Sequence, residues 1–375
     1  MPKCTMMVRV ISCWDWLLSA IKARRPGAAI PMNREQKTAA LSNSRTPAGE
    51  IKTEAESVVQ PVVLPSNAFP TDPPADVLLH ARVAPDHDWL RERGELTVRS
   101  GVVSSADATV QFHSDFGPLR QDKPTNQDYA LVWKGKGERS GVPAIAIAIG
   151  DGLTSSYHSE LASQAACSAA LRALVAEMNS DDSRPAFNSA VAAALKAIKA
   201  LRDDLALNPE QSCPPGQFPA TWKYILRQGR LFQTTLTLAW LEGDRLRVGV
   251  VGDGGCLVRA TNLEELKVVA QPDLTTQEVN AIGPGDAGPI PLDQYYDSKN
   301  ERPLIRPIFA VFYTDGVGRG IGAEPAKLIE ALDNPAPPSN DNPALTFIAE
   351  AIQRDPHAFD DNLTLAILRA ASRQQ

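Results

Sequence analysis

Basic clusters, paired cysteines and long apolar runs are scarce in this sequence of 375 residues, and each scarcity excludes a class of protein. No long run of lysine or arginine is present and the formal net charge is −6, so the basic face of a dedicated nucleic-acid binder is not expected. The five cysteines are odd in number and include no CxxC pair, which argues against a disulfide framework and a zinc knuckle. This cysteine usage predicts a reducing, cytoplasmic location.

The N-terminal stretch is apolar but has no uninterrupted segment long enough to span a bilayer. Arg9 and Asp15 interrupt it, and most of its positive charge follows the apolar part, which is the reverse of a secretory signal. We therefore expect no integral membrane span and no secretion. Three interpretations stay open: an interfacial amphipathic helix with Trp14 and Trp16 on one side, a loosely ordered end, or a true start at Met32.

Residues 33–85 are enriched in proline, serine, threonine, asparagine and glutamate. Such a composition buries too little apolar surface to offset the entropy that ordering costs. We expect residues 1–100 to be an N-terminal extension, largely disordered or linker, and residues 101–372 to form one domain.

Beyond this extension, short apolar segments alternate with alanine-rich amphipathic ones. The segments that predict strands are 128–133, 144–149, 235–241, 246–251, 255–259, 308–313 and 363–368. Those that predict helices are 159–178 and 187–206, with weaker ones near 324–333 and 343–353. Tight turns such as LEGDRL join neighbouring strands, so we predict an α+β domain with antiparallel sheets inside and helices outside.

Aspartates lie where the predicted strands begin, end or turn. They are Asp128, Asp151, Asp253, Asp315 and Asp361, and glycine directly follows Asp151, Asp253 and Asp315. Asp-Gly is a common turn dipeptide, but three of them behind apolar strands make coincidence a poor explanation. Carboxylates gathered at one end of a β core need cations to balance their charge. Oxygen ligands without histidine or cysteine favour Mg²⁺ or Mn²⁺ over zinc.

Five segments in a fixed order carry a resemblance to a known family. NQDYALV, AIAIGDG, TTLTLAWLEGDRLRVGVVGDGG, FAVFYTDGVG and DDNLTLAIL together resemble the signature set of the metal-dependent protein phosphatases, the PPM or 2C-type Ser/Thr phosphatases. Within that family the chain resembles the bacterial branch, which carries NQD in place of NED. The resemblance covers about residues 105–370. It implies a β-sandwich of two antiparallel sheets flanked by α-helices, with a metal centre at one end.

The resemblance also implies roles for individual residues. Asp151 matches the ligand that bridges two metal ions, and the carbonyl of Gly152 matches a further ligand. Asp315 and Asp361 match ligands of the second ion, and Asp128 matches the carboxylate that holds metal-bound water. The aspartate of the VGDG segment, Asp253, matches a residue near a third, weaker metal.

The sequence departs from the family pattern at two places. The phosphate-binding arginine of the family is replaced by Lys123, and Arg120 lies three residues upstream. Either can hold a phosphate group, or both are solvated loop cations. In place of the glycine-rich DGxGG, this chain has DGLTSSYH, in which His158 is either a proton donor to the leaving oxygen or an ordinary helix-start residue.

These observations predict a cytoplasmic phosphoprotein phosphatase that hydrolyses phosphoserine and phosphothreonine with a metal-activated water. The expected cofactors are two or three Mg²⁺ or Mn²⁺ ions, and the expected partners are phosphoprotein substrates and an opposing Ser/Thr kinase. Two alternatives are a pseudophosphatase that acts as a binding module and a hydrolase of small phosphate esters. Retention of all five carboxylates favours an enzyme, because a non-catalytic descendant has no reason to keep acids that repel one another. Residues 260–307 match the family's variable flap, and residues 207–231 are expected to be a surface insertion.

Overall fold

The computed structural model describes residues 85–371 with short internal gaps. The gaps are 106–107, 117–124, 138–139, 179–182, 208–212, 214–217, 228–230, 264–265, 273–278, 286–287, 302–303, 321–327, 330–331, 333–341 and 360. Among the helices of the described ranges, none is both long and apolar enough to cross a membrane.

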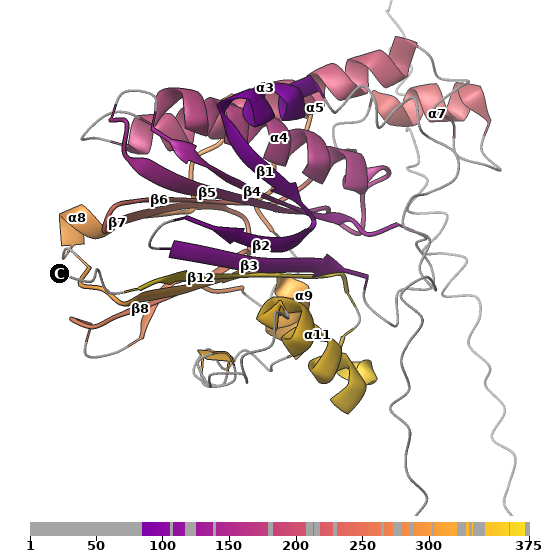
Figure 1. Ribbon diagram of the computed structural model, residues 1–375. Coiled ribbons are helices and arrows are strands. Elements are labelled where there is room, and N and C mark those ends of the chain that lie inside the picture. The colour runs from indigo at the N-terminus through magenta and orange to yellow at the C-terminus, as the bar shows by residue number, and fades with distance from the viewer. Residues whose placement is uncertain are drawn as a thin grey trace, which may run out of the picture. The chain divides into compact units, whose positions relative to one another are not determined.

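Two six-stranded sheets, antiparallel throughout, lie face to face (Figure 1). The first has the order β1-β4-β5-β6-β7-β10 and the second β2-β3-β12-β11-β8-β9. The strands of the first are β1 (Gly94–Val98), β4 (Asp128–Lys136), β5 (Pro143–Asp151), β6 (Leu236–Glu242), β7 (Arg245–Val251) and β10 (Gln294–Asp297). Those of the second are β2 (Ser100–Ser104), β3 (Ala108–Asp115), β8 (Gly255–Ala260), β9 (Lys267–Ala270), β11 (Ile308–Tyr313) and β12 (Leu363–Ala370).

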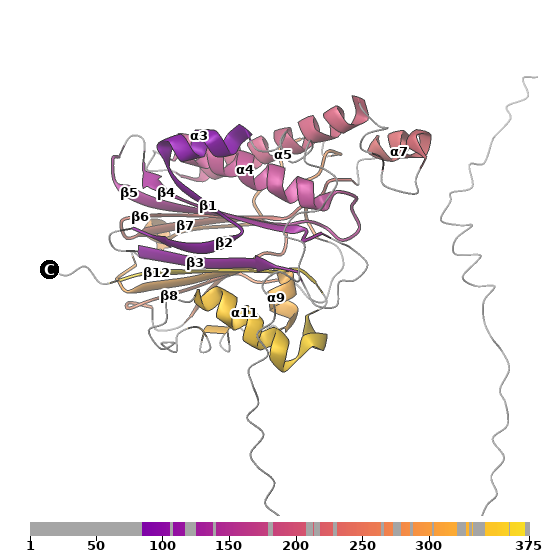
Figure 2. The ribbon, with the colours of Figure 1, turned by 45° about the vertical axis from the view of Figure 1, so that its right-hand side comes forward.

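Helices cover the outer face of each sheet (Figure 2). The first sheet is covered by α3 (Pro85–Arg93), α4 (Ser159–Glu177) and α5 (Arg184–Leu207), and the second by α9 (Asp315–Gly320) and α11 (Pro343–Arg354). Shorter helices are α7 (Pro219–Leu226), α8 (Ser298–Glu301) and the 3-10 turn η1 (Pro356–Ala358). Residues 85–371, as far as the structure describes them, are thus layered helix, sheet, sheet, helix, with one core between the sheets and one beneath each helical layer.

Strand β5 shows how the sequence specifies these layers. Its isoleucines belong to the core between the sheets: Ile145, Ile147 and Ile149. Its alanines belong to the core beneath the helices: Ala144, Ala146 and Ala148. Successive side chains of a strand point to opposite faces, so AIAIAI presents a large face to the other sheet and a small one to the helices. Both faces are buried, which explains why the segment is a continuous apolar run.

The α+β sandwich and the seven predicted strands are confirmed, with boundaries moved by at most three residues, and so are the two long helices and α11. The weaker helix near 324–333 falls mostly outside the described residues. All four edge strands, β1, β2, β9 and β10, were missed, because edge strands are partly exposed and lack a continuous apolar run. Strand β3 was missed as well, since its burial alternates along ATVQFHSD.

The folded region includes residues before 101, the expected start of the domain. Strand β1 pairs with β4, and α3 packs Leu90 into the core, where its side chain is 0% exposed. The indole Nε1 of Trp133 donates a hydrogen bond to the carbonyl of Leu90 at 3.1 Å. Helix α3 was not predicted because PDHDWLRER is mostly polar and shows little helical periodicity.

Candidate metal centre

The strands bring four of the five aspartates to one end of the sandwich. Strand β4 begins at Asp128 and β5 ends at Asp151, and these two residues are cross-strand partners. Asp315 begins α9 directly beyond β11, and Asp361 precedes β12 by two residues. Strands β11 and β12 are antiparallel neighbours in which the last residue of β11 pairs with the third of β12. The register therefore places these carboxylates on adjacent strand ends in both sheets.

Asp128 joins the two sheets through hydrogen bonds. The hydroxyl groups of Thr314 and Thr364, both from the second sheet's side, donate to its Oδ2 at 2.9 Å each. Its other oxygen, Oδ1, is buried and has no hydrogen-bond partner, and the residue is 1% exposed. Burial is the main cause that raises the pKa of Asp128 to about 7, and the charge of Asp361 adds to it.

Asp151 is held by its backbone. The amide of Thr235 and the hydroxyl of Thr234 donate to the Asp151 carbonyl at 2.9 and 3.0 Å. The Asp151 amide in turn donates to Thr235 Oγ1 at 3.3 Å, so both threonines hold the backbone of Asp151 in place. Asp151 keeps some exposed surface, but burial of its carboxyl group still raises the pKa well above its usual value, and the charges of Asp128 and Asp315 raise it further.

Asp315 and Asp361 share a cation. The guanidinium of Arg319 donates to Asp315 Oδ2 at 2.5 Å, and its Nη1 lies 3.7 Å from Asp361 Oδ2. The second oxygen of Asp315, Oδ1, is buried without a hydrogen-bond partner. Asp253 lies in the turn after β7, and burial followed by the charge of Asp315 raises its pKa to about 6, while Arg319 acts in the opposite direction. All five aspartates therefore interact electrostatically.

Close backbone approach explains two of the Asp-Gly pairs. A Cβ on Gly316 would lie 2.0 Å from the carbonyl oxygen of Asn362, beside Asp361. A Cβ on Gly152 would lie 2.6 Å from the carbonyl oxygen of Ser159, the first residue of α4. Each glycine thus lets the chain after an aspartate pack directly against another backbone segment.

His158 occupies the left-handed region, with φ of 52°, at the residue before α4. Its Nδ1 lies 3.0 Å from Glu160 Oε1, and its ring stacks on Phe232 and meets Trp222 edge-on. Trp222 comes from α7, so the expected surface insertion packs on the loop that follows Asp151. These contacts fix the imidazole, and its role as a proton donor stays a prediction.

Sequence reasoning missed three residues of the site: Thr314, Thr364 and Arg319. Thr314 directly precedes the third Asp-Gly pair, and Thr364 stands in DDNLTLAIL. The strand pairing, once known, would have placed both beside Asp128. The two candidate phosphate-binding residues, Lys123 and Arg120, lie outside the described residues.

The donor set fits a hard divalent cation by its chemistry. In the described ranges, no group of three or more carboxylate, imidazole or thiol side chains is arranged to hold an ion by itself. The aspartates nevertheless supply only oxygen ligands, and two of these oxygens, Oδ1 of Asp128 and Oδ1 of Asp315, are buried without hydrogen-bond partners. Burial, followed by the charges of neighbouring aspartates, raises the pKa of Asp128, Asp151 and Asp253. The side-chain amide of Asn362 is likewise buried with neither polar atom paired. Mg²⁺ or Mn²⁺ suits such a site better than zinc does.

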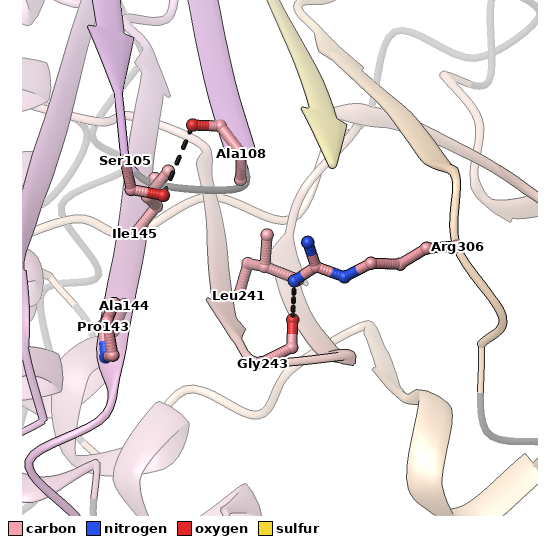
Figure 3. A pocket seen from close by; sticks show the side chains of 8 residues that line it. All are labelled: Ser105, Ala108, Pro143, Ala144, Ile145, Leu241, Gly243 and Arg306. Carbon is pink, nitrogen blue, oxygen red and sulfur yellow. Dashed lines mark hydrogen bonds between the residues drawn. The ribbon is translucent and has the colours of Figure 1, made fainter. Parts of the chain in front are cut away.

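A small cavity lies beside the start of β5, the end of that strand opposite Asp151, and Figure 3 shows the side chains that line it. Its lining residues are Ser105, Ala108, Pro143, Ala144, Ile145, Leu241, Gly243 and Arg306. The Arg306 guanidinium donates to the carbonyl of Gly243 at 2.7 Å. The cavity borders the start of β5, whereas Asp151 ends that strand, so the two are about 25 Å apart at the rise of an extended chain. The cavity is therefore separate from the aspartates.

Comparison with known proteins gives a match over part of the chain. Residues 119–278 match the family described as protein phosphatase 2C. Among curated proteins, no significant match is found.

Several solved structures are similar to the chain. The catalytic domain of the serine/threonine protein phosphatase PstP, in complex with two manganese ions, is 20% identical, with 71% of this chain and 99% of that chain covered and a TM-score of 0.46. Stp1 of Staphylococcus aureus is 17% identical, with coverage of 70% and 95% and a TM-score of 0.45. PppA of Pseudomonas aeruginosa is 16% identical, with coverage of 72% and 100% and a TM-score of 0.44.

Proposed function

We propose that the protein is a Mg²⁺- or Mn²⁺-dependent phosphatase of phosphoserine and phosphothreonine in proteins, a proposal that the match of residues 119–278 to the family described as protein phosphatase 2C supports. The observation that supports this most is the cluster of buried, mutually repelling aspartates at one end of the sandwich. A cytoplasmic location and an opposing Ser/Thr kinase are part of the same proposal.

The residues of this chain would divide the work as follows. Asp151, the Gly152 carbonyl, Asp315 and Asp361 would hold two divalent ions, and Asp253 would serve a third, weaker site. When bound, such ions lower the pKa of water and neutralise negative charge on phosphoryl oxygens.

Asp128 would orient the attacking water. Thr314 and Thr364 engage its Oδ2, so its rotation is restricted and Oδ1 is left to accept a hydrogen bond. Water held in one orientation needs less reorganisation to reach the transition state. The carboxylate therefore acts by positioning, and the two threonines fix its direction.

The test is hydrolysis of p-nitrophenyl phosphate and of a phosphothreonine peptide with Mn²⁺ or Mg²⁺, repeated in EDTA. We expect turnover of both substrates with metal and none in EDTA. Asp151→Asn and Asp315→Asn should each weaken Mn²⁺ binding in calorimetric titration and reduce the rate by several orders of magnitude. Asp253→Asn should weaken metal binding less. Asp203→Asn, on the exposed face of α5, is the matched control and should change neither quantity.

The outcomes separate the proposal from its alternatives. Folded, Mn²⁺-loaded protein that hydrolyses neither substrate would indicate a pseudophosphatase. Turnover of p-nitrophenyl phosphate alone, with phosphopeptides left intact, would indicate a hydrolase of small esters. Unchanged Mn²⁺ binding in both Asp151→Asn and Asp315→Asn would refute the metal centre.

A further inference from the structure

Arg319 is a positive charge placed among the aspartates by the first turns of α9. Asp315 begins this helix and Arg319 follows four residues later, so both lie on one helix face. One nitrogen of its guanidinium donates to Asp315 at 2.5 Å, and another lies 3.7 Å from Asp361. Its charge also opposes the rise that burial and the charge of Asp315 cause in the pKa of Asp253. One side chain thus acts on three of the five site carboxylates.

A guanidinium and a divalent ion compete for the same carboxylate oxygens. Arginine stays protonated, offers only donors and cannot ligate a metal. Two cations beside one carboxylate repel each other, more strongly where burial lowers the effective dielectric constant. The side chain of Asp315 is 8% exposed and that of Arg319 is 44% exposed, so the arginine can withdraw into solvent while the aspartate stays in place.

We propose that Arg319 is an internal counter-cation of the site: it neutralises Asp315 and Asp361 in the metal-free protein and competes with divalent ions for their oxygens. The metal-binding half of this inference rests on the function proposed above. Arg319 then sets the metal concentration at which the centre fills, and it limits carboxylate repulsion when the centre is empty. It is a positioning residue, since it acts through the two aspartates.

The test compares Arg319→Gln and Arg319→Lys with the wild type in two measurements: calorimetric Mn²⁺ titration, and thermal melting of metal-free protein in EDTA. Loss of the charge in Arg319→Gln should tighten Mn²⁺ binding about threefold to tenfold, as removal of a partly exposed charge next to an ion predicts. The same variant should melt a few degrees lower in EDTA, roughly 2–4 °C for a domain of this size. Arg319→Lys keeps the charge and should stay near the wild type in both.

Arg354→Gln is the control for the loss of an arginine, because Arg354 is exposed in the last turn of α11 and makes no ion pair with a site aspartate in the described ranges. It should change neither Mn²⁺ affinity nor the metal-free melting temperature. A general structural role of Arg319 would lower the melting temperature without tightening Mn²⁺ binding, and lysine would not rescue it.

Either of two results would overturn the inference. In EDTA, Arg319→Gln would melt at the same temperature as the wild type. Alternatively, the wild type would bind Mn²⁺ and Arg319→Gln would bind it with the same affinity. Failure of the proposed function looks different, because wild type would then bind no Mn²⁺ and hydrolyse neither substrate. In that case the melting comparison in EDTA alone decides. A lower melting temperature for glutamine but not for lysine supports the counter-cation, and equal temperatures refute it.

Discussion

Replacing Asp128 with asparagine should stabilise the metal-free protein at pH 8, although this residue is among the most deeply buried of the site. Its pKa is raised from 3.8 to about 7, so the folded state disfavours the charged form. A difference of about three units corresponds to roughly 4 kcal/mol at 1.36 kcal/mol per unit. Asparagine has the same shape and accepts the same threonine hydrogen bonds through its oxygen, but it carries no charge.

The gain is smaller than this figure because asparagine brings its own cost. Its amide nitrogen would occupy the place of Oδ1, where its partner would be the Asp151 carboxyl group, and an imperfectly paired buried donor costs about 1–3 kcal/mol. We therefore expect a net stabilisation of about 1–3 kcal/mol at pH 8. Because the folded pKa is raised, the stability that protonated Asp128 contributes is fully present below about pH 4 and is lost as the pH rises through 7.

Urea unfolding in EDTA at pH 4, 6 and 8 measures the effect. Wild-type stability should fall relative to Asp128→Asn across this range, with the variant equal or less stable at pH 4 and more stable at pH 8. The exposed substitution Asp203→Asn should run parallel to the wild type. If the Asp128→Asn curve also runs parallel, Asp128 does not titrate with a raised pKa and the electrostatic account of the site is wrong.

Three further substitutions test the packing around the site. Gly316→Ala should prevent correct folding of this end, because its Cβ would lie 2.0 Å from the Asn362 carbonyl; circular dichroism and melting in EDTA would detect the loss. Leu90→Ala should cost about 2–5 kcal/mol in urea unfolding, since a fully buried leucine leaves a cavity, and an unchanged midpoint would show that α3 is not part of the core. Thr364→Val removes a hydrogen-bond donor to Asp128 and should lower the free energy of unfolding by about 1–3 kcal/mol at pH 8. The loss should be smaller at pH 5, where the Asp128 carboxyl group is protonated, and equal losses at the two pH values would contradict the assigned bond.

The interior of the fold could be predicted from the sequence, whereas its edges could not. Strands such as β5 are buried on both faces, so their apolar runs stand out in any window. Strand β1 has one neighbour and is only partly buried, and nothing in GELTV distinguishes it from a loop. The pairing of β1 with β4 depends on the tertiary arrangement, which no local pattern encodes.

The same distinction holds for the site. The aspartates are recognisable because each lies next to an apolar run, before it or after it, and because the order of the segments resembles a known family. Thr314 and Thr364 touch Asp128 across more than 180 residues of chain, so their contribution depends on how the two sheets stack. Arg319 could have been suspected from its spacing of four from Asp315, but the involvement of Asp361 required the pairing of β11 with β12.

The alanine face of β5 makes the position of the site loop depend on residues far from it. Methyl groups at 144, 146 and 148 set how closely α4 approaches the first sheet, and the first residue of α4 presses its carbonyl against Gly152. A larger side chain at Ala146 would push α4 away from the first sheet. Because α4 moves as a rigid unit, its first residue would then shift against the chain beside Asp151. A substitution on the alanine face of β5, which touches no site residue, would thus change the alignment of the aspartates through the position of α4.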